Sequence, residues 1–162
     1  MKKMVVMRGC PGSGKSTFAK EILALHKSVG EQGAIFSTDN YFTAGPYYFF
    51  SREALGQAHQ WNKWMVLQAA KNDVPLIIVD NTNIIHAEIL PYFTIANQHQ
   101  YEFEIQEPNL WWSTNPLECF RRCTHKVPLE TIQRMLDKMI STSDILKSLD
   151  WCKQYGLYNN IT

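Results

Sequence analysis

Residues 9–16, "GCPGSGKS", constrain the possible folds of this chain more than any other stretch. They match G-x-x-x-x-G-K-[ST], a glycine-rich loop whose backbone N–H groups can surround a phosphate. Residues 4–8 form a short apolar run that predicts a strand before the loop, and residues 15–25 carry apolar side chains at helical spacing. A helix that begins at such a loop directs the positive end of its dipole at the phosphate. The pattern therefore predicts an α/β fold that binds a nucleotide at this loop.

The residues of the loop have expected roles in holding this nucleotide, for which we predict ATP with Mg²⁺. Lys15 would reach the β- and γ-phosphates, and the Ser16 hydroxyl would be a ligand of the metal ion. Glycines in the loop allow backbone conformations that turn N–H groups inward. The predicted nucleotide-binding set is Gly12, Ser13, Gly14, Lys15, Ser16 and Thr17, the last on the α-phosphate side. A preference for ATP over GTP is not encoded in this pattern.

The rest of the chain alternates between strand and helix patterns. Further strands are predicted at 33–37, 75–80 and 101–106, and helices at 51–72, 86–98, 115–123, 128–139 and about 144–154. Residues 75–80, "PLIIVD", are a continuous apolar run, which is typical of a strand covered on both faces. We therefore expect a mainly parallel sheet with helices on both faces, in one domain that spans residues 1–162.

The length and composition indicate an ordinary globular protein. The chain has 162 residues, of which 45% are hydrophobic and 19% charged, and its net charge is +1. This balance does not predict a broad basic surface for tight duplex binding. No apolar run reaches the roughly 18 residues that span a bilayer, so we expect no membrane partner. The expected location is intracellular and cytoplasmic, with the nucleus left open, and the oligomeric state is not predicted.

The four cysteines do not suggest a disulfide framework in a chain of this length, which favours a reduced compartment. Cys119, Cys123 and His125 are close enough in sequence to suggest a metal cluster, but structural zinc almost always has four ligands. We therefore expect the cysteines to pack in the interior.

Two carboxylates follow predicted strands, where a parallel sheet places its ligands. Asp80 ends the apolar run 75–80, and a carboxylate at that position can support Mg²⁺ beside the phosphates. The alternative is a capping role within "DNTN". Asp39 follows the strand 33–37, on the side where an acceptor hydroxyl would lie, so it is a candidate general base. The alternative for Asp39 is the N-cap of a short helix at 40–43.

Several motifs in order resemble a known family. These are "MKKMVVMRGCPGSGKSTFAKEI", "STDNYF", "AHQWN", "IIVDNTNI", "PYFTIA" and "NPLECFRRCTHKVP". The first resembles the start of the 5′-kinase domain of bacteriophage polynucleotide kinase. The others resemble more closely the polynucleotide-kinase-like P-loop domains of the Nedd-ligase-binding proteins. The resemblance extends from about residue 3 to residue 139.

The resemblance implies a kinase that phosphorylates a hydroxyl. In that family the residue matching Asp39 activates the acceptor, and the acid matching Asp80 belongs to the acidic set of the active site. A helical lid at about 116–127 carries arginines toward the transferred phosphate. Here these are Arg121 and Arg122, which diverge by about 100° on a helix, so one of them is expected to reach inward. Arg122 fits the family pattern better.

The acceptor side contains a departure from the phage enzyme, which has an arginine where this chain has Phe42. Residues 41–50, "YFTAGPYYFF", include aromatic rings that could stack on a nucleobase or could pack against the long helix. Packing is the favoured interpretation. His59 and Asn62 are candidates for the wall of the acceptor pocket, and the side chains of Asn81, Thr82 and Asn83 could hold a sugar or a phosphate.

The favoured function is phosphoryl transfer from ATP to a hydroxyl, with the 5′-OH of a polynucleotide as the first choice of acceptor. Single-stranded nucleic acid ends are therefore the expected partners. One alternative keeps the kinase and replaces the acceptor by a nucleoside, a modified base or another small metabolite. The other is a nucleotide-binding interaction module with little catalysis.

Overall fold

The computed structural model describes residues 1–156 and contains a four-stranded, all-parallel sheet. Its strand order is β2 (Gly33–Phe36), β5 (Leu76–Asp80), β1 (Lys3–Met7) and β6 (Glu102–Gln106). The side chains of Leu76 to Val79 are buried, as the continuous apolar run predicts for an inner strand. Because Met7 of β1 pairs with Asp80 of β5, the phosphate loop begins beside the carboxyl end of β5.

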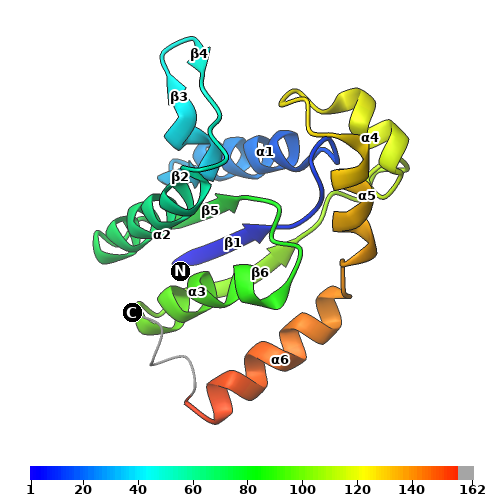
Figure 1. Cartoon of the computed structure of the whole chain (residues 1–162). Helices are drawn as coiled ribbons and strands as arrows, with labels where there is room; N and C mark the ends of the chain where they lie inside the picture. Colours follow the sequence, from blue (N-terminus) through cyan, green and yellow to red (C-terminus); the bar gives the residue numbers. More distant parts are fainter. Residues whose placement is uncertain (157–162) are drawn as a thin grey trace.

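Helices cover both faces of the sheet, which confirms the predicted fold class (Figure 1). Helix α1 (Lys15–Ser28) packs on one face, and α2 (Leu55–Lys71), α3 (His86–Gln98) and α6 (Thr142–Gln154) pack on the other. Strand side chains alternate between the two apolar cores, with Val5 on the α1 side and Val6 on the opposite side. Within residues 1–156, no helix combines the length and the hydropathy needed to cross a membrane.

The remaining elements lie beyond the carboxyl ends of the strands. A 3-10 helix, η1 (Thr38–Phe42), follows β2 and leads into a small hairpin of β3 (Thr43–Ala44) and β4 (Tyr47–Tyr48), which projects from the sheet (Figure 1). Helices α4 (Pro116–Arg122) and α5 (Leu129–Asp137) lie past the ends of β1 and β6. The hairpin was not predicted.

Two helix boundaries differ from the prediction because of their capping serines. Helix α2 begins at Leu55 rather than at residue 51, since the Ser51 hydroxyl accepts the N–H of Ala54 at 3.3 Å and closes a turn before the helix. Helix α6 begins at Thr142, two residues earlier than predicted, because the Ser141 hydroxyl accepts the N–H of Asp144 at 3.2 Å.

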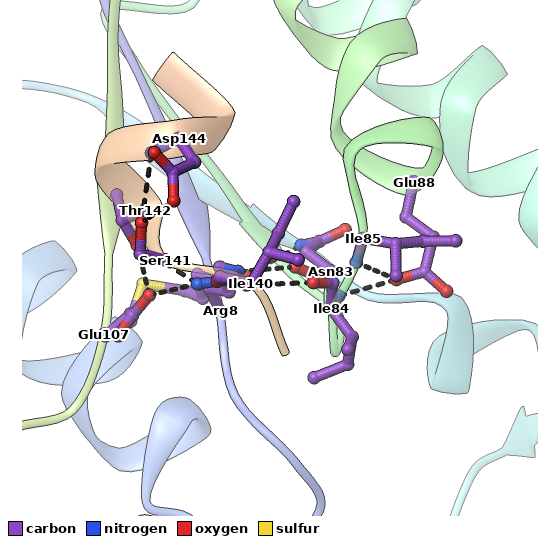
Figure 2. Close-up of polar contacts among 11 residues, drawn as sticks. Arg8, Asn83, Ile84, Ile85, Glu88, Glu107, Ile140, Ser141, Thr142 and Asp144 are labelled. Atoms are coloured by element: carbon purple, nitrogen blue, oxygen red, sulfur yellow. Dashed lines mark hydrogen bonds and ion pairs between the residues drawn. The ribbon is translucent and has the colours of Figure 1, made fainter. Parts of the chain in front are cut away.

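Arg8, the residue before the first glycine of the loop, is a fully buried cation that connects three chain segments (Figure 2). Its guanidinium donates to Glu107 at 2.6 Å, to Thr142 at 3.2 Å and to the carbonyl of Ile84 at 2.9 Å. It also donates to the carbonyls of Asn83 and Ile140. The start of the phosphate loop is thereby tied to the loop after β5, the end of β6 and the start of α6.

Candidate active site

The phosphate loop has the backbone that its glycines predict. Gly12 and Gly14 have φ angles of +79° and +100°, in the region that favours glycine. Helix α1 starts directly after Gly14 without a side-chain cap, so its first N–H groups face the loop. Ser16 and Thr17 lie exposed in its first turn. The loop therefore presents uncapped N–H donors, as a phosphate site requires.

Lys15 is buried inside the loop, and its Nζ donates to the carbonyl of Cys10 at 3.0 Å. Burial lowers the pKa of Lys15 from its ordinary value, and the negative charges of Asp80 and, more weakly, of Asp39 oppose that shift. Both predicted carboxylates thus lie near this ammonium. An incoming phosphate would add a further negative charge that stabilises the protonated lysine.

Asp80 ends β5 with a half-buried side chain, and its Oδ1 is buried without a hydrogen-bond partner among residues 1–156. A buried carboxylate oxygen without a partner is costly unless a donor or a cation reaches it. Oxygen ligands are the ones that Mg²⁺ prefers. The side chains of Asp80 and Ser16 therefore fit the predicted metal ion.

Asp39 lies in η1, directly after β2. Ser37 caps this short helix by accepting the N–H of Asp39 at 3.3 Å, so the capping alternative for Asp39 is wrong. The neighbouring Thr38 is fixed to the core, since its N–H donates to Asn81 Oδ1 at 2.8 Å and its hydroxyl lies 3.2 Å from His59 Nδ1. The carboxylate of Asp39 itself is half-exposed.

Several predicted acceptor residues belong to the scaffold instead. The Asn62 side chain is fully buried and donates to the Tyr92 hydroxyl at 3.0 Å. The amide of Asn81 donates to the same hydroxyl, and that of Asn83 donates to the carbonyl of Met7 at 2.7 Å. The NH2 groups of these amides are thus committed to Tyr92 and Met7 rather than to a sugar or a phosphate.

The aromatic stretch 41–50 divides into two groups. Tyr41 contacts Trp61 of α2, and Phe42 is buried and contacts Phe50, which agrees with the predicted packing. Tyr47 and Phe49 are about two-thirds exposed and pack only loosely on each other, which the packing interpretation did not predict. This part of the chain therefore presents two aromatic rings to solvent.

The predicted lid segment, residues 116–127, begins with α4, which Asn115 caps through the N–H groups of Leu117 and Glu118. Helix α4 approaches the phosphate loop so closely that a Cβ on Gly12 would lie 1.9 Å from the carbonyl oxygen of Cys119. This approach places the helix that carries the two arginines directly on the loop.

Both lid arginines pair with Glu118 of their own helix. The distance from Arg121 to Glu118 is 2.8 Å, and Arg122 contacts the second oxygen of the same carboxylate. The Arg122 guanidinium also lies 4.6 Å from the ring centre of Trp112 and 5.5 Å from that of Trp111. The Nη1 groups of both arginines are therefore occupied by Glu118, and they must leave it before they can bind a phosphate.

Two residues at Asp39 were not predicted. The Tyr48 hydroxyl donates to Asp39 Oδ1 at 3.2 Å, and His125 Nε2, in the loop after α4, lies 3.5 Å from Asp39 Oδ2. From the sequence, Tyr48 was expected to pack against the long helix or to stack on a base, and His125 was considered only as a metal ligand. The contact depends on the fold, so no local pattern indicates it.

The cysteines pack as predicted. Cys10 and Cys119 are fully buried and form an apolar cluster with Ile132, while His125 lies at Asp39 instead. Burial raises the pKa of Cys10 to about 12, with a smaller contribution from Cys119. The Cys10 thiol therefore stays protonated and serves as an apolar filler of the loop.

The strand, phosphate loop and helix at the switch point of a parallel sheet define a P-loop nucleotide-binding protein with a kinase-like fold. The chain belongs to the family whose model is described as an AAA domain, which matches residues 4–141. The resemblance inferred from the motifs is confirmed by human NEDD4-binding protein 2, which is 38% identical over 148 residues.

Other relatives and solved structures share parts of this domain. The human protein match covers 90% of this chain and 8% of that protein, so the chain spans a small part of its length. A 2',3'-cyclic-nucleotide 3'-phosphodiesterase of Pongo abelii is 29% identical, over 68% of this chain and 25% of that protein. The structure of the Pnkp1/Rnl/Hen1 RNA repair complex matches with a TM-score of 0.62 and 17% identity, over 85% of this chain and 44% of the other. The Mycobacterium tuberculosis APS kinase CysC in complex with AMPPNP and APS matches with a TM-score of 0.54 and 16% identity, over 75% and 68%.

Proposed function

We propose that this protein is an ATP-dependent kinase that transfers the γ-phosphate to a hydroxyl, with the 5′-OH of a polynucleotide as the favoured acceptor. The observation that carries the proposal is the placement of Asp39 and Asp80 near the buried Lys15, at the ends of neighbouring strands. A nucleotide site needs only one of these acids for its metal. On this proposal the second acid, Asp39, serves the acceptor hydroxyl.

On this proposal the loop holds the triphosphate. The backbone N–H groups of Gly12, Ser13 and Gly14 bind its oxygens, Lys15 spans the β- and γ-phosphates, and Thr17 lies on the α-phosphate side. Ser16 and Asp80 would hold Mg²⁺, which would supply positive charge beside the transferred phosphate.

The transfer itself uses Asp39 as general base. The hydroxyl proton moves to the Asp39 carboxylate as the acceptor oxygen forms a bond to the γ-phosphorus. The bond from that phosphorus to the β–γ bridging oxygen breaks, and ADP leaves with its electron pair. Arg122, with Arg121 as the second candidate, exchanges Glu118 for the equatorial oxygens and stabilises their charge.

Two observations support a polynucleotide acceptor over a small one. The exposed rings of Tyr47 and Phe49, which flank Tyr48 in the chain, offer stacking surfaces, and bases of a single strand bind to such surfaces. The family likeness to NEDD4-binding protein 2 and the fold shared with an RNA repair complex agree with this choice. A small acceptor is the second candidate, because Phe42 is buried where the phage enzyme has an arginine, and because an APS kinase shares the fold.

The test is an acceptor screen with labelled ATP and Mg²⁺ on 5′-OH oligonucleotides, nucleosides and APS. We expect label on the oligonucleotides. The affinity of the protein for the oligonucleotides should fall steeply with added salt, because it depends on contacts to phosphates. Label on nucleosides or APS alone would establish the small-acceptor alternative. Binding of ATP without any labelled product would support the interaction module and reject the kinase.

The variant Asp39→Asn tests the base. It should lower transfer about 10²- to 10⁴-fold, the usual contribution of a general base, with little change in ATP affinity. Asp150→Asn is the matched control, since Asp150 lies exposed on α6, and it should keep full activity. Equal turnover of the two variants would remove Asp39 from this role.

A further inference from the structure

Asp39, the candidate general base, is contacted by two segments that lie outside the sheet. The Tyr48 hydroxyl, on β4 of the hairpin, reaches one oxygen of Asp39 at 3.2 Å. The His125 ring, in the loop between α4 and α5, reaches the other oxygen at 3.5 Å. Among residues 1–156 these are the polar contacts that the Asp39 carboxylate makes. Its direction is therefore set by the hairpin and the lid segment.

The two rings also contact each other. Their centres lie 4.6 Å apart with an angle of 38° between the planes, so the hairpin and the lid segment meet above Asp39. Burial and the nearby Asp39 charge raise the pKa of Tyr48 to about 12, so the phenol remains a hydrogen-bond donor at neutral pH. The pair forms a small aromatic roof, defined as Tyr48 with His125, over one side of the carboxylate.

The backbone of Asp39 is held separately. Its N–H donates to Ser37 Oγ, and its carbonyl accepts the hydroxyl of Thr43 at 3.1 Å. These local contacts fix where the residue sits, and they leave the rotation of its side chain free. A carboxylate that must accept a proton from a hydroxyl in line with the γ-phosphate needs a fixed rotation as well.

We propose that Tyr48 and His125 are positioning residues, which orient the Asp39 carboxylate toward the acceptor hydroxyl and close the acceptor site when the lid segment lies over it. The proposal rests on the proposed kinase function. Each carboxylate oxygen has two acceptor positions, so one contact on each oxygen leaves room for the substrate hydroxyl. Because His125 belongs to the lid segment that carries Arg121 and Arg122, the orientation of the base depends on the same segment that binds the transferred phosphate.

Kinetics of Tyr48→Phe, His125→Ala and His125→Gln test this arrangement. A misdirected base lowers the rate of the chemical step, so Tyr48→Phe and His125→Ala should each lower kcat about 10- to 100-fold, with the KM for ATP within twofold of wild type. His125→Gln can place an amide N–H where His125 Nε2 lies and should recover part of the loss. In Tyr48→Phe/His125→Ala the losses should be less than multiplicative, because both residues act on one carboxylate.

The matched control is Tyr155→Phe, which removes an exposed phenol at the end of α6 and should retain wild-type kcat. Losses no larger than in this control would overturn the proposal. A loss of ATP affinity by the same factor as the loss of kcat would indicate a structural role, and so would a melting temperature clearly below that of wild type. Either result would equally overturn the proposal.

A measurement without turnover separates this proposal from the proposed function. In NMR spectra of isotope-labelled protein, Asp39→Asn should shift the ring resonances of Tyr48 and His125 from their wild-type positions. Asp150→Asn should leave these resonances in place. If the wild type phosphorylates no acceptor, the proposed function fails while these shifts still report the contact. Unmoved ring resonances would show that the roof does not hold Asp39 in solution.

Discussion

Replacing Arg8 by methionine should destabilise the protein strongly, because methionine fills much of the same volume without donating a hydrogen bond. The guanidinium is 1% exposed and serves acceptors on three segments (Figure 2). In Arg8→Met the carbonyls of Asn83 and Ile84 would remain buried without this donor. Each unsatisfied buried group costs about 1–3 kcal/mol. Glu107 is 38% exposed, so water can replace the arginine there.

The total agrees with the cost of breaking a buried ion pair, about 3–5 kcal/mol. For a domain of this size, each kcal/mol lowers Tm by about 2–4 °C, so Arg8→Met should melt about 6–20 °C below wild type. Urea unfolding and calorimetry measure this change. Arg134→Met, on the exposed side of α5, is the matched control and should stay within about 0.5 kcal/mol.

Each unsatisfied buried group should cost at least about 1 kcal/mol, and Arg8→Met leaves at least two of them. A free energy of unfolding for Arg8→Met within about 1 kcal/mol of wild type would therefore refute this reasoning. If that variant does not fold, Arg8→Lys gives a second measurement. A lysine has one nitrogen with three donors, so it cannot reach all three segments and should lose an intermediate part of the stability.

Two further predictions concern the phosphate loop and the lid segment. Gly12→Ala should weaken ATP binding and lower stability more than Gly30→Ala does. The two glycines have nearly equal φ angles, +79° and +82°, so the backbone strain is matched. A Cβ at Gly12 would meet Cys119, whereas a Cβ at Gly30 would meet open space. Calorimetric titration and melting of both variants isolate that contact, and equal losses would contradict it. Glu118→Gln should bind a non-hydrolysable ATP analogue a few-fold more tightly, because it frees Arg121 and Arg122, while Glu130→Gln on α5 should match wild type. Weaker binding by Glu118→Gln would show that Glu118 helps the arginines instead of competing with the nucleotide.

The sheet and the loop could be predicted from the sequence because their signals are local. The apolar run that ends in Asp80 and the glycine spacing around Lys15 each determine their structure within a few residues. The hairpin β3–β4 could not be predicted in this way, since each strand has two residues and no alternating pattern. Its turn has Gly45 at a φ of +60°, followed by Pro46, and this Gly-Pro pair is a local signal for a bend but not for a hairpin.

The acceptor side was predicted less well because its contacts depend on the fold. Asn62, Asn81 and Asn83 are polar residues near a sheet end, and the sequence cannot tell that Tyr92 and Met7 already use their amides. His125 is far from Asp39 in sequence, and the two meet only when α4 lies on the phosphate loop. Arg8 shows in the sequence only as the end of an apolar run, although it is buried at a junction of three segments.

The buried side of α6 has a consequence for where domains of this kind begin and end. The family match stops at residue 141, yet Ile145 and Leu149 beyond it are buried in the same core as Val6. Thr142 is also a partner of Arg8, next to the phosphate loop. A boundary drawn at residue 141 in a longer protein would therefore separate the loop from part of its support. The smallest fragment that keeps the nucleotide site intact should extend through Gln154.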